Sequence, residues 1–128
     1  MKKYKILIVE DDKQLADLMK LNFPAEQFTA RVCTDSRQAV SDAENDVPSL
    51  IILDVVMPHL DGWDVLAKIR SNPATAAVPV IMCTGRDSVH EVEKSFKMGA
   101  QAFTMKPIIF STLLQKVAAI LNIEQLMK

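Results

Sequence analysis

Acidic side chains follow two apolar segments of this sequence, and this pattern needs a physical reason. Glu10, Asp11 and Asp12 come directly after the apolar run 6–9, and Asp54 ends another apolar stretch. Removing a carboxylate from water costs several kcal/mol, so an acidic residue at such a position is expected to be exposed, hydrogen-bonded or bound to a cation. Asp54 alone is more simply explained as a turn residue, so its role depends on which other side chains lie near it.

Two further apolar segments end in polar side chains: Thr84 supplies a hydroxyl at the end of one, and Lys106 supplies an ammonium group at the end of the other. If these segments are parallel strands, their carboxyl ends form one edge, where α/β proteins bind ligands. Carboxylates gathered there repel one another unless they share a cation, and Mg²⁺ prefers carboxylate and water oxygens. A carboxylate beside Mg²⁺, a lysine and a hydroxyl suits phosphoryl transfer, with Asp54 as the nucleophile.

The elements that would position these side chains alternate between strands and helices along the chain. Continuous or alternating apolar runs predict strands, at 6–9, 28–33 (an edge strand), 49–54, 79–84 and 102–105. Helical spacing and stop signals predict helices, at 13–23, about 34–44, 63–70, between 88 and 99, and 110–121. This alternation predicts an α/β fold, doubly wound, with helices on both faces of one parallel sheet.

Local signals at the helix ends support these boundaries. In the first helix, Leu15, Leu18, Met19 and Leu21 are expected to form the apolar face, and Pro24 ends the helix.

Two other helices differ in their starts. Ser88 and Glu91 have the spacing of a capping box, and Gly99 has the position of a helix-ending glycine. The last helix starts with Ile108-Ile109-Phe110 in place of the polar capping residue often found there, so we expect no side-chain cap, and an apolar patch if these side chains are exposed.

Length and composition exclude several classes of protein. The 128 residues suit one domain, and the net charge of −1 leaves no basic excess for direct nucleic-acid binding. The apolar run 6–9 is too short for a signal peptide and no stretch could cross a membrane, so we expect a cytoplasmic protein. Cys33 and Cys83 are isolated, as reduced core residues would be.

Taken together and in order, these motifs resemble the receiver domain of two-component response regulators. The matching residues cover the run 6–12, Leu53-Asp54, Met57-Pro58, Asp61-Gly62, Thr84-Gly85 and Lys106-Pro107. The resemblance spans about residues 5–121 and implies a flavodoxin-like fold, with a five-stranded sheet in the order 2-1-3-4-5 and five helices. Because the remaining C-terminal residues are too few for an output domain, we expect one receiver domain over residues 1–128, which is either a free-standing receiver or a domain excised from a longer regulator or hybrid kinase.

The resemblance implies a phosphoryl-accepting role for Asp54 and a Mg²⁺ site around it. Glu10 and Asp11 match the acidic pair of the family, with Asp11 expected to bind the metal directly and Glu10 through water. The backbone carbonyl of Met57 matches a further ligand. Asp12 is either a member of the site or only the capping acid of the first helix.

Three further roles follow from the resemblance. Thr84 matches the switch hydroxyl and Lys106 the phosphate-binding lysine, whose bond to Pro107 is usually cis in the family. Phe103 stands at the position of the switch aromatic residue, and a plain core role is the alternative.

The resemblance also implies partners. A sensor histidine kinase or phosphotransfer protein would donate the phosphoryl group, and a downstream protein would bind the face of the fourth helix, fifth strand and fifth helix. Such a domain assists its own phosphorylation and dephosphorylation but turns over no separate substrate, so we do not expect an enzyme. A Mg²⁺-dependent phosphatase is the rival, but it generally needs an acid two residues after the nucleophile, where this chain has Val56. A degenerate receiver that binds partners constitutively is a further rival, although every expected site residue is present.

Overall fold

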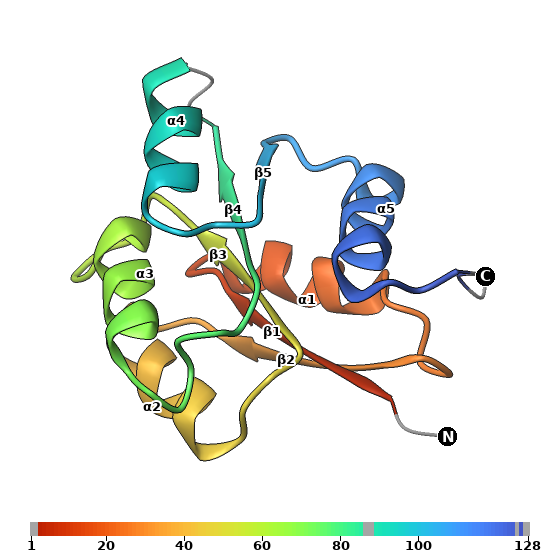
Figure 1. Cartoon of the computed structure of the whole chain (residues 1–128). Helices are drawn as coiled ribbons and strands as arrows, with labels where there is room; N and C mark the ends of the chain where they lie inside the picture. Colours follow the sequence, from red (N-terminus) through yellow and green to blue (C-terminus); the bar gives the residue numbers. More distant parts are fainter. Residues whose placement is uncertain (1–2, 86–88, 125, 127–128) are drawn as a thin grey trace.

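Five apolar segments form the strands of one parallel sheet (Figure 1). In this computed structural model, which describes residues 3–85, 89–124 and 126, the strands are β1 (Tyr4–Val9), β2 (Phe28–Cys33), β3 (Leu50–Asp54), β4 (Val80–Thr84) and β5 (Ala102–Met105). Their spatial order is β2-β1-β3-β4-β5, and every neighbouring pair is parallel. The predicted strand order and the edge position of residues 28–33 are therefore confirmed.

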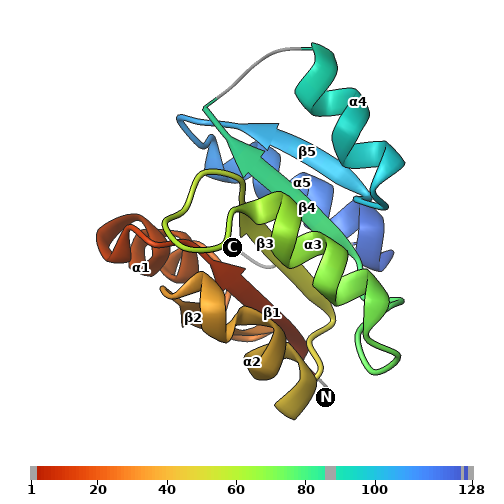
Figure 2. The ribbon, with the colours of Figure 1, turned by 90° about the vertical axis from the view of Figure 1, so that its left-hand side faces the viewer.

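Helices connect the strands and cover both faces of the sheet (Figures 1 and 2). They are α1 (Lys13–Leu21), α2 (Ala39–Asn45), α3 (Gly62–Ser71), α4 (Val89–Lys97) and α5 (Phe110–Leu121). The helices α1 and α5 lie on one face, and α2, α3 and α4 lie on the other. This arrangement is the doubly wound architecture that the alternation of strands and helices predicted.

Each face of the sheet has its own hydrophobic core, because successive strand residues point to opposite faces. In β3, Leu50 and Ile52 pack in the cluster that contains residues of α1 and α5. Ile51 and Leu53 pack in the cluster that contains residues of α2 and α3. Every residue of β3 is buried, which explains why the strand is continuously apolar up to Asp54.

The predicted apolar face of α1 is wrong at two positions. Met19 is buried, but Leu18 is 48% exposed and Leu21 is 81% exposed. With 100° between successive residues, Leu21 falls on the side of the helix opposite to Met19. The helix also ends at Leu21, earlier than predicted, and Phe23 turns back into the core beyond it.

The segment predicted as one helix over about 34–44 is divided. A 3₁₀ turn, η1 (Ser36–Gln38), comes first, and Asp35 caps it by accepting a hydrogen bond from the backbone N–H of Arg37 at 2.9 Å. The helix α2 begins only after this turn. Ser36 is buried as a result, and it faces the loop that follows β3.

Further predictions concern the starts of two helices, the two cysteines and membrane-spanning segments. Ile109 precedes α5 without a side-chain cap, as predicted, and its side chain is 65% exposed. Ser88 of the expected capping box lies outside the described residues. Cys33 and Cys83 are both buried free thiols, which confirms their core role. Among the described residues, none of the helices is long and apolar enough to cross a membrane.

Candidate functional site

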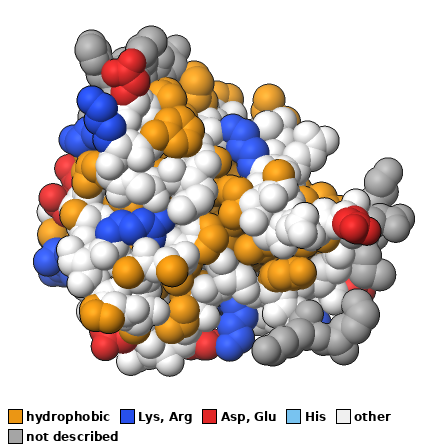
Figure 3. Space-filling model, in the orientation of Figure 1, with side chains coloured by type: hydrophobic (Ala, Val, Ile, Leu, Met, Phe, Trp, Pro, Cys, Tyr) orange, Lys and Arg blue, Asp and Glu red, His pale blue; other side chains and the backbone are white. Residues whose placement is uncertain are grey.

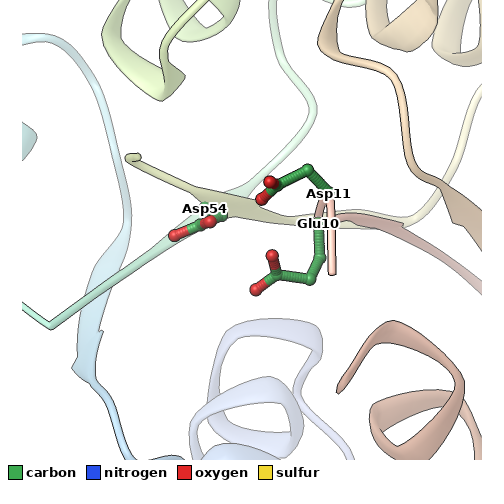
Figure 4. Close-up of side chains that lie close together, drawn as sticks. All are labelled: Glu10, Asp11 and Asp54. Carbon is green, nitrogen blue, oxygen red and sulfur yellow. The ribbon is translucent and has the colours of Figure 1, made fainter. Parts of the chain in front are cut away.

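Three carboxylates meet where β1 and β3 end (Figure 4). Glu10 and Asp11 directly follow β1, and Asp54 is the last residue of the neighbouring strand β3. One oxygen from each carboxylate lies within 4.8 Å of the other two. Glu10 and Asp54 are buried and Asp11 is exposed, so the cluster opens to solvent on the side of Asp11.

Lys106 reaches this cluster from the end of β5. Its Nζ lies 2.6 Å from Oε1 of Glu10 and 3.3 Å from Oδ1 of Asp54. The other carboxylate oxygen of Glu10 accepts a hydrogen bond from the backbone N–H of Asp12 at 3.1 Å. The ammonium group is thus the counter-charge for two buried carboxylates, as the convergence of strand ends predicted.

Burial sets the ionisation of this cluster. It raises the pKa of Glu10 to about 7, although hydrogen bonds from Lys106 and Asp12 oppose the change. Burial also raises the pKa of Asp54, again against the influence of Lys106. For Lys106, burial lowers the pKa, but Glu10 and Asp54 together raise it above its ordinary value. Burial thus favours the protonated forms of Glu10 and Asp54, and the ammonium group of Lys106 opposes this effect only in part.

The donor set of this cluster fits a hard divalent cation. All three side chains of the cluster offer carboxylate oxygens, which Mg²⁺ prefers, and none offers a softer nitrogen or sulfur ligand. A cation there would favour the ionised forms that burial opposes. Asp12 is not a member of this cluster; its carboxylate caps α1 by accepting from the backbone N–H of Leu15 at 3.2 Å.

The remaining predicted side chains lie near the same edge of the sheet. Thr84 ends β4 and is fully buried, and its backbone carbonyl accepts a hydrogen bond from the backbone N–H of Lys106 at 2.8 Å. Phe103 is buried within β5, where Val92 of α4 packs against the same hydrophobic cluster. The peptide bond between Lys106 and Pro107 is cis, as the family resemblance implied.

The loop after β3 is held closely against the end of that strand. The backbone N–H of Gly62 donates to the carbonyl of Val55 at 2.7 Å, and a Cβ on Gly62 would lie 2.3 Å from the backbone oxygen of Asp54. Asp61 and Asp64 form a capping box that begins α3. The sequence marks Asp61-Gly62 as a turn, but the close approach to Asp54 is visible only in the folded chain.

Ser36 is a residue of this region that the sequence did not indicate. Its hydroxyl donates to the carbonyl of Pro58 at 2.9 Å and accepts from the backbone N–H of Leu60 at 3.1 Å. Because these partners are 22 and 24 residues away in the chain, no local spacing could identify the contact.

Comparison with known proteins agrees with this geometry. A family model described as the response regulator receiver domain matches residues 6–118. The chain belongs to this family. It is a receiver domain of two-component response regulators, which are phosphorylation-dependent signalling switches and not classical enzymes.

Individual relatives support this assignment. The chain is 34% identical over 117 residues to the sensory transduction protein RegX3 of Mycobacterium tuberculosis strain H37Rv, covering 91% of this chain and 50% of RegX3. It therefore spans about half the length of that relative.

Solved structures give the same result for the fold. A CheY-like response regulator receiver domain protein from Methanospirillum hungatei superposes with a TM-score of 0.86 at 27% identity, covering 94% of this chain and 95% of the other. A response regulator from Desulfuromonas acetoxidans superposes with a TM-score of 0.85 at 27% identity, covering 95% and 99%. Both likenesses extend over nearly the whole chain, which confirms the predicted flavodoxin-like fold.

Proposed function

We propose that Asp54 accepts a phosphoryl group from a phosphohistidine of a sensor kinase or phosphotransfer protein, in the presence of Mg²⁺. The observation that carries this proposal is the contact of Lys106 with both Glu10 and Asp54 inside a buried carboxylate cluster. A structural ion pair would need one carboxylate for one ammonium group, whereas this cluster keeps an excess of acid. Such an excess suits a site that also binds a divalent cation and a phosphoryl group.

The residues of the cluster have distinct parts in the transfer. An oxygen of Asp54 attacks phosphorus, and the bond between phosphorus and the histidine nitrogen breaks with its electron pair on nitrogen. Asp11, Asp54 and the backbone carbonyl of Met57 would hold Mg²⁺, with Glu10 acting through water, and the bound ion would supply positive charge for the phosphoryl oxygens.

Two side chains on the other side of Asp54 complete the site. The ammonium group of Lys106 binds a phosphoryl oxygen, and the hydroxyl of Thr84 donates a hydrogen bond to another. Thr84 ends β4, the neighbour of β3, and Lys106 follows β5, the next strand beyond β4, so the new charge on Asp54 acts on groups carried by both strands. Thr84 and Phe103 then change their arrangement together, which is the switch.

The switch is read on the face formed by α4, β5 and α5. This face carries three large apolar side chains that are about half exposed or more, Phe96, Met105 and Ile109, and it is hollowed between the two helices. Figure 3 shows hydrophobic side chains gathered over β5 between α4 and α5. An apolar hollow of this kind fits a downstream protein, whose affinity changes with phosphorylation.

The proposal is tested by incubating the protein with Mg²⁺ and acetyl phosphate and measuring its intact mass. We expect one added phosphoryl group, lost in Asp54→Asn and in the presence of a chelator. Asp12→Asn is the matched control, because asparagine still caps α1 and Asp12 lies outside the cluster. No adduct in the unmodified protein, or an adduct that persists in Asp54→Asn, would overturn the assignment.

The same experiment separates the switch from a phosphatase. A phosphatase needs an acid to protonate the leaving group, and two residues beyond Asp54 stands Val56, which is apolar and 52% exposed. We therefore expect no sustained release of phosphate from phosphate monoesters. Such release would favour the phosphatase.

A further inference from the structure

The loop that follows β3 adopts a conformation that an outside contact must hold. His59 has φ of 70°, in the left-handed region that a residue with a side chain rarely enters. On either side of it, the carbonyl of Pro58 and the N–H of Leu60 converge on one hydroxyl, that of Ser36. This hydroxyl uses its single donor and one acceptor site on two backbone groups of the same turn.

Ser36 is itself fixed firmly enough to act as an anchor. It is 2% exposed, and it begins the 3₁₀ turn η1, which Asp35 caps through the N–H of Arg37. The carbonyl of Asp35 accepts from the thiol of Cys33 at the end of β2. The turn that carries Ser36 is thus attached to the sheet on one side and to the loop after β3 on the other.

The loop segment that Ser36 holds begins one residue after the carbonyl proposed as a metal ligand. The side chain of Met57 is buried in the hydrophobic core, and the ring of Pro58 fixes the φ angle of Pro58 itself. With the carbonyl of Pro58 also fixed by Ser36, little rotational freedom remains for the carbonyl of Met57.

We propose that Ser36 is a positioning residue for Mg²⁺ binding, which holds the loop so that the Met57 carbonyl faces the carboxylates of Asp11 and Asp54. This inference rests on the proposed function, since it assigns Ser36 to the same metal site. Ser36 does not touch the metal, and its effect passes through the backbone of Pro58. Residues that orient a ligand in this way commonly change metal affinity by about ten- to a hundredfold.

The first test is Ser36→Ala, with Mg²⁺ affinity measured by calorimetric titration and stability measured by urea unfolding. We expect about tenfold weaker Mg²⁺ binding. The matched control is Ser95→Ala, because Ser95 is also fully buried and its hydroxyl bonds one backbone carbonyl, that of Glu91, at 3.0 Å. It should lower stability in the same way and leave Mg²⁺ affinity unchanged. Unchanged affinity in Ser36→Ala would overturn the proposal, even if stability falls.

A second measurement needs no substitution and decides the matter if Ser36→Ala does not fold. Coupling between two events is reciprocal, so if the contact of Ser36 favours Mg²⁺ binding, Mg²⁺ must favour the contact by the same factor. Hydrogen exchange at the N–H of Leu60 should then slow as Mg²⁺ is added, while exchange at the N–H of Arg37, which bonds Asp35 within η1, should not change. Equal behaviour of the two amides would overturn the proposal.

Failure of this inference is distinguishable from failure of the proposed function. If the unmodified protein takes up a phosphoryl group on Asp54 but Ser36→Ala binds Mg²⁺ normally, only the role of Ser36 is wrong. If the unmodified protein binds no Mg²⁺ at all, the metal site itself is wrong, and the role of Ser36 is rejected with it.

Discussion

Replacing Lys106 by methionine gives a direct test of the charge balance at the site. The methionine keeps much of the length of the side chain but removes the ammonium group that lies 2.6 Å from Glu10 and 3.3 Å from Asp54. Without metal, two buried carboxylates then remain near each other with no cation between them. We expect the free energy of unfolding to fall and the affinity for Mg²⁺ to rise.

The size of the stability loss follows from the burial of the three groups. Removing one partner of a fully buried ion pair costs about 3–5 kcal/mol. Here the side chain of Lys106 is 25% exposed, and Glu10, with a pKa of about 7, can take up a proton near neutral pH. Both facts reduce the cost, so we expect a loss of about 2 kcal/mol in the presence of a chelator.

The affinity for Mg²⁺ should change in the opposite direction, because Lys106 repels a cation bound to the same carboxylates. Charges of +1 and +2 about 6 Å apart repel by about 1.4 kcal/mol at the dielectric constant of water. Lys106→Met should therefore bind Mg²⁺ about tenfold more tightly. Saturating Mg²⁺ should also restore more stability to the variant than it adds to the unmodified protein.

The assay is urea unfolding followed by circular dichroism, with chelator and with saturating Mg²⁺, together with calorimetric titration of Mg²⁺. Lys13→Met is the control, since Lys13 pairs with Asp17 at 3.0 Å with both side chains half exposed or more. An exposed pair of this kind contributes about 0–1 kcal/mol. Weaker Mg²⁺ binding in Lys106→Met, or a stability loss no larger than that of the control, would refute this reasoning.

Four other measurements test separate parts of the structure. Gly62→Ala should lose about 3 kcal/mol of stability in urea unfolding, because its Cβ would meet the backbone oxygen of Asp54 at 2.3 Å; a neutral result would contradict that contact. Ile109→Asp should gain about 1 kcal/mol, because α5 lacks a side-chain cap; no gain would mean that the exposed isoleucine stabilises the helix equally well. Burial raises the pKa of Cys33 to about 12 and that of Cys83 as well, so neither should react with a thiol reagent in the folded protein at neutral pH. Because the folded state favours the protonated thiols, their contribution to the free energy of unfolding is complete below the ordinary thiol pKa of 9.0 and should be lost as pH rises from there toward 12. A free energy of unfolding that is constant over this range would contradict their burial.

The main features of the fold could be predicted because they depend on local patterns. β3 is apolar throughout because both of its faces are buried, and this left Asp54 visible as an exception at its end. Asp11 and Lys106 could be assigned to the same edge because parallel strands place their carboxyl ends together. The convergence of the carboxylates and the lysine was therefore predictable from topology, without any contact being known.

The features that could not be predicted depend on contacts between distant segments. The face of α1 was predicted wrongly because Leu18 and Leu21 are apolar, whereas the core covers the side of the helix that carries Ala16 and Met19. The single helix expected over about 34–44 is divided, with the buried hydroxyl of Ser36 directed at a loop more than 20 residues away. The spacing of residues within α1 or within 34–44 does not indicate which side chains the rest of the fold covers or contacts.

The position of Lys106 also explains how an event at Asp54 can act on a distant surface. In the sheet order β1-β3-β4-β5, the lysine starts at the end of β5 and reaches past β4 to carboxylates on β3 and β1. The ion pairs of Lys106 with Glu10 and Asp54 therefore connect the end of the edge strand β5 to the ends of the strands β1 and β3. If Asp54 accepts a phosphoryl group, as we propose, that group would be a stronger partner for Lys106, and we expect β5, which precedes the lysine, to shift in response. Because the exposed side chain of Met105 immediately precedes Lys106, we expect such a shift to change the apolar face between α4 and α5 directly, without any intermediate element.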